Sequence, residues 1–230
     1  YWFEGRRLTS VSRFIRDFTP VFDTEGQAEK YANKHGLEKE EVLKMWSDKS
    51  EKSKKKGIFG HTCVEKFFKD GEILETIDEN IFSSDEIDKL YLLLSNLLDN
   101  YDIIGIEQVV WDPSNNIAGT YDLLCQHKNT KEYYLIDWKT NNKIELSNSF
   151  NKMLDPISYL DSANFIHYSL QLSLLKHCIK ADMGIDVHKM VICHISNNIY
   201  EIPVDYMEKE LKTLFDYKKD KNSFKQFSLI

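Results

Sequence analysis

The stretch Ile117–Asn142, IAGTYDLLCQHKNTKEYYLIDWKTNN, holds two strand-like segments joined by the turn-forming residues Lys-Asn-Thr. Each segment is mainly apolar but contains an aspartate, Asp122 in the first and Asp137 in the second. A carboxylate buried in a strand without a partner strongly destabilises a fold. We therefore expect a cation, or another polar partner, beside each of these two aspartates.

Residues two apart on a strand point to the same face, so Asp137 shares a face with Lys139, and Thr120 shares one with Asp122. If the two strands pair, both carboxylates and the lysine ammonium converge at one edge of the sheet. Converging carboxylates repel each other unless a cation or a proton lies between them. Oxygen ligands with an open side suit Mg²⁺ or Mn²⁺. A purely structural Asp-x-Lys pair remains the simpler alternative from these residues alone.

The segment from Gly57 to Gly71 predicts a short amphipathic helix. His61, Val64, Glu65 and Phe68 follow the spacing of residues that share one helical face. Val64 and Phe68 must point to the core, so His61 and Glu65 are expected to point the same way. His61 is then either a satisfied core histidine or part of a site with Glu65.

Gln171 is an uncharged polar residue in NFIHYSLQLSLLKHCI, residues 164–179, a segment that is apolar on nearly all sides. Such a helix is expected to be buried. A buried amide needs hydrogen-bond partners, and these can be either structural or part of a site.

The hydrophobic periodicity along the chain predicts a mixed α/β domain built on one sheet, with most of a helical extension at the N-terminus. Thr24 is the expected cap of the second helix, and Ser83 and Glu86 form a capping box before the fifth. The three central strands are expected to form an antiparallel meander. Helices are expected at 10–18, 24–36, 38–57, 57–71, 87–101, 162–181 and 205–219, and strands at 103–111, 117–126, 132–140, 188–195 and 199–204.

Composition indicates one sizeable globular domain, or a core with a helical extension, in 230 residues. We divide it into residues 1–100, a helical region carrying His61, and residues 101–230, the core, which together are expected to form one compact unit. The four cysteines are scattered without a Cys-x-x-Cys pair, which suits a reducing compartment inside a cell and argues against a zinc ribbon. No apolar run approaches the roughly 20 residues of a membrane span.

The net charge of −7 is not that of a general nucleic-acid binder. Basic residues nevertheless gather in two short stretches, which are either DNA-binding patches or solvated helix faces. They are Arg6, Arg7, Arg13 and Arg16, and Lys49, Lys52, Lys54, Lys55 and Lys56.

Taken together, these residues resemble the RecB-like branch of the PD-(D/E)XK nuclease superfamily, which includes phage exonucleases and the mitochondrial genome maintenance exonuclease. The resemblance covers roughly residues 57–180. Leu175 stands where the family often has Tyr, and the cysteines do not match the four-cysteine iron–sulfur cluster of some members, so no cluster is expected. The matching motifs are Gly57-x-x-x-His61-x-x-x-Glu65, Glu107, Gly119-x-x-Asp122, Asp137-Trp138-Lys139-Thr140 and Gln171.

The resemblance implies a restriction-endonuclease-like core with a divalent metal held by His61, Asp122, Asp137 and the backbone carbonyl of Trp138. It implies that Lys139 holds the attacking water. The resemblance also gives Gln171 the role of orienting that lysine or a phosphate. Supporting roles are expected for Glu65 and Glu107.

The implied function is a Mg²⁺- or Mn²⁺-dependent deoxyribonuclease, an exonuclease acting on DNA ends or single strands in replication, recombination or repair. The alternatives are a structure-specific or restriction-like endonuclease, and a nuclease fold retained as a nucleic-acid-binding module. A helicase or another replication or recombination protein is an expected partner, and a membrane is not. The expected location is the cytoplasm, a phage- or virus-infected cell, or a mitochondrion.

Overall fold

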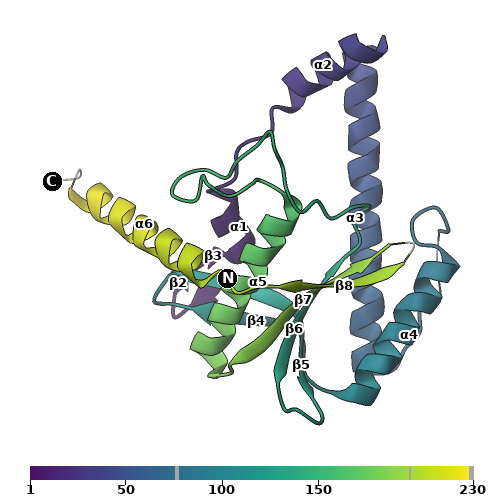
Figure 1. Ribbon diagram of the computed structural model, residues 1–230, viewed down its shortest axis with the longest axis vertical. Coiled ribbons are helices and arrows are strands. Elements are labelled where there is room, and N and C mark those ends of the chain that lie inside the picture. The colour runs from purple at the N-terminus through teal and green to yellow at the C-terminus, as the bar shows by residue number, and fades with distance from the viewer. Residues whose placement is uncertain (76–77, 197, 228–230) are drawn as a thin grey trace.

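The computed structural model of the protein describes residues 1–75, 78–196 and 198–227, and its centre is a mixed β-sheet with helices around it (Figure 1). The strands are β1 (Trp2–Phe3), β2 (Arg6–Arg7), β3 (Thr9–Ser10), β4 (Tyr101–Asp112), β5 (Ile117–His127), β6 (Tyr133–Lys139), β7 (Val187–Ile195) and β8 (Ile199–Val204). The helices are α1 (Val11–Arg16), α2 (Thr24–His35), α3 (Lys39–Asp70), α4 (Ser84–Asn100), α5 (Asn164–Met183) and α6 (Glu208–Phe227).

Strands β4, β5 and β6 form the antiparallel meander that the sequence predicts. Strand β7 pairs with β6 in parallel, and β8 pairs with β7 antiparallel. Parallel neighbours need a crossover connection, and α5 provides it between β6 and β7. The predicted fold class, a mixed α/β domain on one central mixed sheet flanked by helices, is therefore confirmed.

The two faces of the sheet belong to two apolar clusters, because side chains alternate along each strand. Leu124 and Leu135 pack in a cluster with residues of α1, α5 and α6. Leu123 and Ile136 pack in another cluster with residues of α3 and α4. Each fully buried leucine or isoleucine stabilises the fold by roughly 1.5–3 kcal/mol relative to an exposed one. A strand buried on both faces reads as a continuous apolar run, which is the pattern seen in β5 and β6.

Helix α3 is one continuous helix of 32 residues, so the predicted division into two helices at Gly57 is wrong. Glycine commonly ends a helix, but Gly57 and Gly60 lie inside this one, where α3 passes Thr140 at the end of β6. A Cβ at Gly60 would lie 3.0 Å from Thr140 Cγ2, so the missing side chain permits the close approach. The helix ends instead at Gly71, with φ 68, as predicted.

The N-terminal part of α3 stands clear of the sheet and is covered by α2 (Figure 1). A small cluster of Ala28, Ala32 and Val42 holds these two helices together. Asp23, rather than the predicted Thr24, caps α2 by accepting a hydrogen bond from the Gly26 N–H at 3.0 Å. Both residue types cap helices well, so composition could not choose between these neighbours.

The predicted capping box of Ser83 and Glu86 is present at the start of α4. The short strands β1, β2 and β3 were not expected, since two residues are too few to show any periodicity. Helices α1, α3 and α4 of residues 1–100 pack on a sheet that residues 101–230 mainly build. The division at residue 100 stays a prediction. In the described part of the chain, no helix has both the length and the apolar character needed to cross a bilayer.

Substituting two glycines tests the account of α3 and of the core. Gly57→Ala should stabilise the protein by roughly 0.5–1 kcal/mol, because alanine suits a helix interior and its Cβ would lie 3.6 Å from Thr140 Oγ1. Gly119→Ala should destabilise it by about 1–3 kcal/mol through overpacking, since its Cβ would lie 2.7 Å from Leu175 Cδ2 and 2.9 Å from Val11 Cγ2. Urea unfolding measures both. A strongly destabilising Gly57→Ala would contradict a continuous α3.

Candidate metal centre

Strands β5 and β6 separate at the two aspartates. The last paired residues of the ladder are Leu123 and Ile136. Asp122 and Asp137 therefore stand opposite each other one step beyond it. Across this opening the Trp138 N–H donates a hydrogen bond to Asp122 Oδ2 at 2.8 Å. Only 8% of Asp122 and 1% of Asp137 is exposed, so bulk water solvates neither carboxylate well.

Asp137 is held by one amide and one ammonium group. Gln171 Nε2, from α5, donates to Asp137 Oδ1 at 3.2 Å. Asp137 Oδ2 forms an ion pair with Lys139 Nζ. This Oδ2 is buried and accepts no hydrogen bond from the described residues, so the ion pair is its main compensation. Lys139 in turn lies over the ring of Tyr168, with Nζ 4.8 Å from the ring centroid.

His61 reaches the opening from α3. Its Nδ1 lies 3.1 Å from Glu107 Oε1 and 3.8 Å from Asp122 Oδ2, and its Nε2 lies 3.3 Å from the Trp138 carbonyl oxygen. Both ring nitrogens therefore face oxygen atoms, and only the doubly protonated imidazolium can donate to both. Burial lowers the pKa of His61, but the hydrogen bond to Glu107 and the charges of Asp122 and Glu107 outweigh burial and raise it above 6.5.

Glu107 arrives at the site through an unusual backbone conformation on β4. Its φ is 49°, in the left-handed region that residues other than glycine seldom occupy. Such strain persists only where the surroundings enforce it, and it gathers at functional sites. Here the conformation accompanies the placement of the carboxylate beside His61.

The pKa of Asp122 is raised to about 7, first by burial and then by the neighbouring charge of Asp137. His61, Lys139 and the Trp138 N–H act in the opposite direction but do not cancel these effects. The pKa of Lys139 is raised above its usual value, since Asp137 and Asp122 outweigh the effect of its burial. The opening thus brings three carboxylates, those of Asp122, Asp137 and Glu107, beside one lysine and one histidine.

These residues fit a divalent metal ion. His61, Glu107 and Asp122 each offer a ligand atom, and the three atoms lie within 4.8 Å of one another. One imidazole nitrogen with carboxylate oxygens is a donor set that Mg²⁺ or Mn²⁺ accepts. A bound cation would also relieve the repulsion from Asp137 that, after burial, raises the pKa of Asp122. For His61 to bind a metal, the metal must replace a proton on its ring.

The structure brings most of the predicted site residues together. Asp122, Asp137, Lys139, His61 and the Trp138 carbonyl all lie at the opening. Glu107, expected in a supporting role, lies 3.1 Å from His61 Nδ1, and that role stays a prediction.

Glu65 lies away from this group. Its side chain is 43% exposed and pairs with Lys69 at 2.7 Å, one turn further along α3. Its supporting role stays a prediction. Leu175, which stands in place of a tyrosine, is buried in the core beside Gly119.

Tyr168 is the contact that the sequence hypothesis missed. It lies three residues before Gln171 on α5, so the two side chains share a helical face. That spacing was the available signal. The tyrosine covers Lys139 while Gln171 holds Asp137, so one helix face supports both charged groups.

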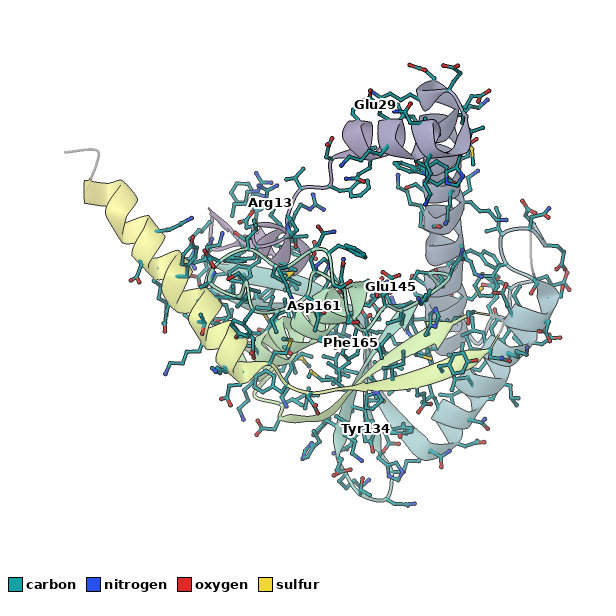
Figure 2. All side chains as sticks on the ribbon, turned by 45° about the horizontal axis from the view of Figure 1, so that its top comes forward. Arg13, Glu29, Tyr134, Glu145, Asp161 and Phe165 are labelled. Atoms are coloured by element: carbon teal, nitrogen blue, oxygen red, sulfur yellow. The ribbon has the colours of Figure 1, made fainter. Side chains whose placement is uncertain are left out.

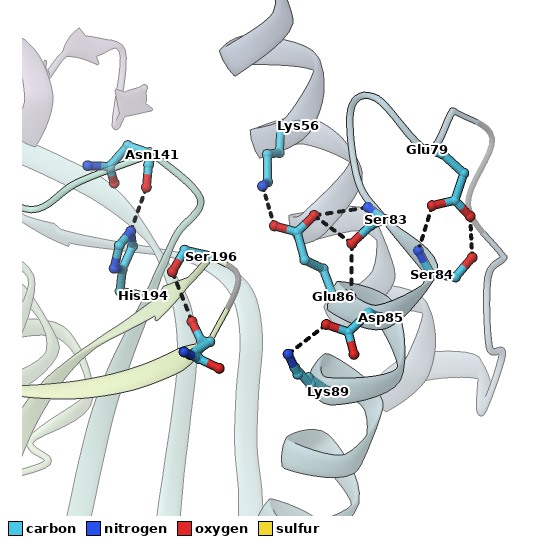
Figure 3. Close-up of polar contacts among 11 residues, drawn as sticks. Lys56, Glu79, Ser83, Ser84, Asp85, Glu86, Lys89, Asn141, His194 and Ser196 are labelled. Carbon is cyan, nitrogen blue, oxygen red and sulfur yellow. Dashed lines mark hydrogen bonds and ion pairs between the residues drawn. The ribbon is translucent and has the colours of Figure 1, made fainter.

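The lysines of the predicted basic patch on α3 have different surroundings in the structure. Lys49, Lys52 and Lys56 line a cavity of about 600 Å³ that also reaches Thr140, next to Lys139. The acidic residues Asp48, Glu79 and Glu86 line the same cavity. Lys56 is engaged in a nearly buried ion pair, with Nζ 2.5 Å from Glu86 Oε1 (Figure 3). Lys54 pairs with Glu51 at 2.7 Å. Lys49 and Lys52 are therefore the better placed of these lysines to meet a substrate.

The four arginines of the other predicted basic patch also have different surroundings. Arg6 donates a hydrogen bond to the Pro113 carbonyl, and Arg13 pairs with Asp17 at 3.2 Å. Figure 2 shows Arg13 on α1, well separated from α3. Arg16, on the same helix, lines a cavity that also contains Gln171. Arg7 is exposed on β2.

No protein-family model matches this chain, and no curated protein matches it. Among solved structures, one match is a protein of Eubacterium rectale named "Putative exonuclease", with 12% identity, 93% of this chain and 79% of that chain covered, and a TM-score of 0.43. A second is the protein SSO0001, with 16% identity, 73% of this chain and 86% of that chain covered, and a TM-score of 0.29. Both likenesses are too weak to assign a role to any residue here.

The raised pKa of Asp122 predicts how stability depends on pH without metal. Folding favours its protonated form, so the free energy of unfolding should fall as pH rises from 3.8 to about 7. Asp122→Asn, which stays neutral, should remove most of this fall, which can reach about 1.4 kcal/mol per pH unit. The raised pKa of His61 leaves a smaller fall above pH 6.5 in the variant.

Urea unfolding in EDTA at several pH values between 4 and 7 measures this effect. Asp85→Asn is the control, because Asp85 is 72% exposed and should leave the wild-type pH dependence unchanged. Parallel curves for wild type and Asp122→Asn would contradict the buried, charge-coupled state of Asp122.

Proposed function

We propose that this protein is a metal-dependent nuclease that hydrolyses phosphodiester bonds in DNA. The observation that carries the proposal is the convergence of Asp122, Asp137, His61 and Lys139 at the open end of two central strands. A structural ion pair would need one carboxylate and one cation. Here three carboxylates, those of Asp122, Asp137 and Glu107, meet Lys139 and His61 at one opening, and this excess of carboxylates favours a bound metal ion.

In this proposal Asp122, Asp137, His61 and the Trp138 carbonyl hold the cation, with Glu107 as a further ligand or as the partner that orients His61. When bound, the cation supplies Lewis-acid polarisation of a phosphate oxygen and a lower pKa for a bound water.

The remaining groups act directly on the substrate or hold others in place. Lys139 offers an ammonium group to the attacking water and to the negative charge that develops on the phosphate. Gln171 holds Asp137 in the orientation that the cation needs. Tyr168 limits the movement of Lys139 and shields it from water.

The proposed substrate is DNA, held by local positive charge because the protein as a whole is acidic. Lys49 and Lys52 line the cavity of about 600 Å³ that reaches Thr140, next to Lys139. Its third lysine, Lys56, is paired with Glu86. An exonuclease that acts on ends or single strands is the preferred form, and an endonuclease of the same chemistry is the alternative. A helicase or other recombination partner stays a prediction.

The decisive test is cleavage of end-labelled single- and double-stranded DNA with Mn²⁺ or Mg²⁺. Asp137→Asn should lower the cleavage rate by on the order of 10²–10³-fold or more, because it removes a metal ligand and the partner of Lys139. Asp85→Asn is the control, because Asp85 is 72% exposed and lies outside the site on α4, and this variant should cleave at the wild-type rate.

Three outcomes separate the alternatives. Cleavage by the wild type in excess EDTA would contradict the metal-dependent mechanism. Cleavage of a closed circular single strand would favour an endonuclease. Binding without cleavage under all metal conditions would favour a nucleic-acid-binding module.

The lysine cavity predicts a specific salt dependence of DNA binding. Replacing Lys49 and Lys52 with Ser should weaken binding of every sequence and flatten the slope of log K against log salt by about 0.7 for each single-strand phosphate that the variant no longer neutralises. The rate at saturating DNA should change little. The control is Lys54→Ser with Lys55→Ser, which leaves the cavity lining intact. Equal effects of the two double variants would mean that the lysines act only through general charge.

A further inference from the structure

A second cavity, of about 220 Å³, lies between α1 and α5. Ser12, Arg16 and Thr19 line it from α1 and the residues that follow, and His167, Tyr168 and Gln171 line it from α5. None of the residues that line it is an aspartate or a glutamate. Its formal charge is therefore positive, in a protein whose net charge is −7.

This cavity adjoins the metal centre through two side chains. Gln171 both lines the cavity and donates to Asp137 at 3.2 Å. Tyr168 both lines it and contacts the Lys139 ammonium with its ring. A molecule in the cavity would thus lie one side chain away from Asp137 and Lys139.

Arg16 differs from Arg13, on the same helix, in its ion pairing. Arg13 forms an ion pair with Asp17 at 3.2 Å. Within the described part of the chain, Arg16 has no ion-pair partner and its side chain is exposed at the cavity. A guanidinium free to donate several hydrogen bonds is the group best suited to a phosphate.

Each of the two cavities is lined by a residue next to the metal centre or in contact with it. One includes Thr140, next to Lys139, and carries Lys49 and Lys52. The other includes Gln171 and carries Arg16. A strand that presents one phosphate at the metal centre would have neighbouring phosphates on either side of it.

We propose that the cavity between α1 and α5 binds the phosphate next to the cleaved one on the same strand, with Arg16 as its cation and the hydroxyl groups of Ser12 and Tyr168 as further donors. The inference rests on the proposed function, because it places both phosphates on one substrate strand. It assigns to α1 a role in holding the substrate in register with the metal centre.

The experiment combines DNA in which one phosphate is made neutral with a protein variant that lacks Arg16. Short single-stranded oligonucleotides each carry one methylphosphonate, which removes the charge of a single phosphate, and their affinity is measured by fluorescence anisotropy in EDTA. The wild type should lose affinity about tenfold at one position, the size of one charge-assisted hydrogen bond. Arg16→Ala should bind the unmodified strand about tenfold more weakly and show no further loss at that position.

Two variants control for folding and general charge. Arg16→Lys should keep part of the position-specific loss, because it retains the charge without the planar fork. Arg13→Ala should behave as the wild type. The proposal is overturned if the wild type binds no oligonucleotide, if neutralisation has the same effect at every position, or if Arg13→Ala matches Arg16→Ala.

The failure of this inference is distinguishable from the failure of the proposed function. DNA cleavage with Mn²⁺ but without the Arg16-dependent position would overturn the inference alone. If the position that depends on Arg16 is found but no DNA is cleaved, the phosphate site is supported and the proposed nuclease activity is contradicted.

Discussion

The repulsion between Asp122 and Asp137 is the constraint around which this structure is organised. Both carboxylates are almost fully buried at the point where β5 and β6 part. Neither water nor a strand partner can take up their combined charge. Lys139 forms an ion pair with Asp137, whereas burial and the neighbouring charge of Asp137 raise the pKa of Asp122 to about 7.

The rest of the fold supplies the partners that this pair requires. Helix α5 places Gln171 on Asp137, while α3 brings His61 to Asp122 and to the carbonyl of Trp138. Strand β4 adds Glu107 through a left-handed residue. These contacts come from elements far apart in the chain, and the two apolar clusters on either face of the sheet hold those elements in place.

Several features of this arrangement could be read from spacing. The pairing of Asp137 with Lys139 follows from the two-residue repeat of a strand, and the need for a partner at Gln171 follows from its apolar helix. The meander, the order of the later elements and the capping box at Ser83 were also correctly predicted. In each case the information lies within a few residues, where backbone geometry sets which side chains share a face.

Contacts between distant segments decided what spacing could not. Gly57 resembles a helix end, yet it lies inside the continuous helix α3, at the stretch that passes Thr140. Lys56 resembles its lysine neighbours, yet it forms an ion pair with Glu86. Arg16, which lines a cavity with Gln171, has no ion-pair partner among the described residues. The sequence by itself determined which residue types carry charge and which face of each element they share. Only the tertiary structure decided which charges are already paired and which meet at the opening, because that depends on the distances between elements that no local pattern encodes.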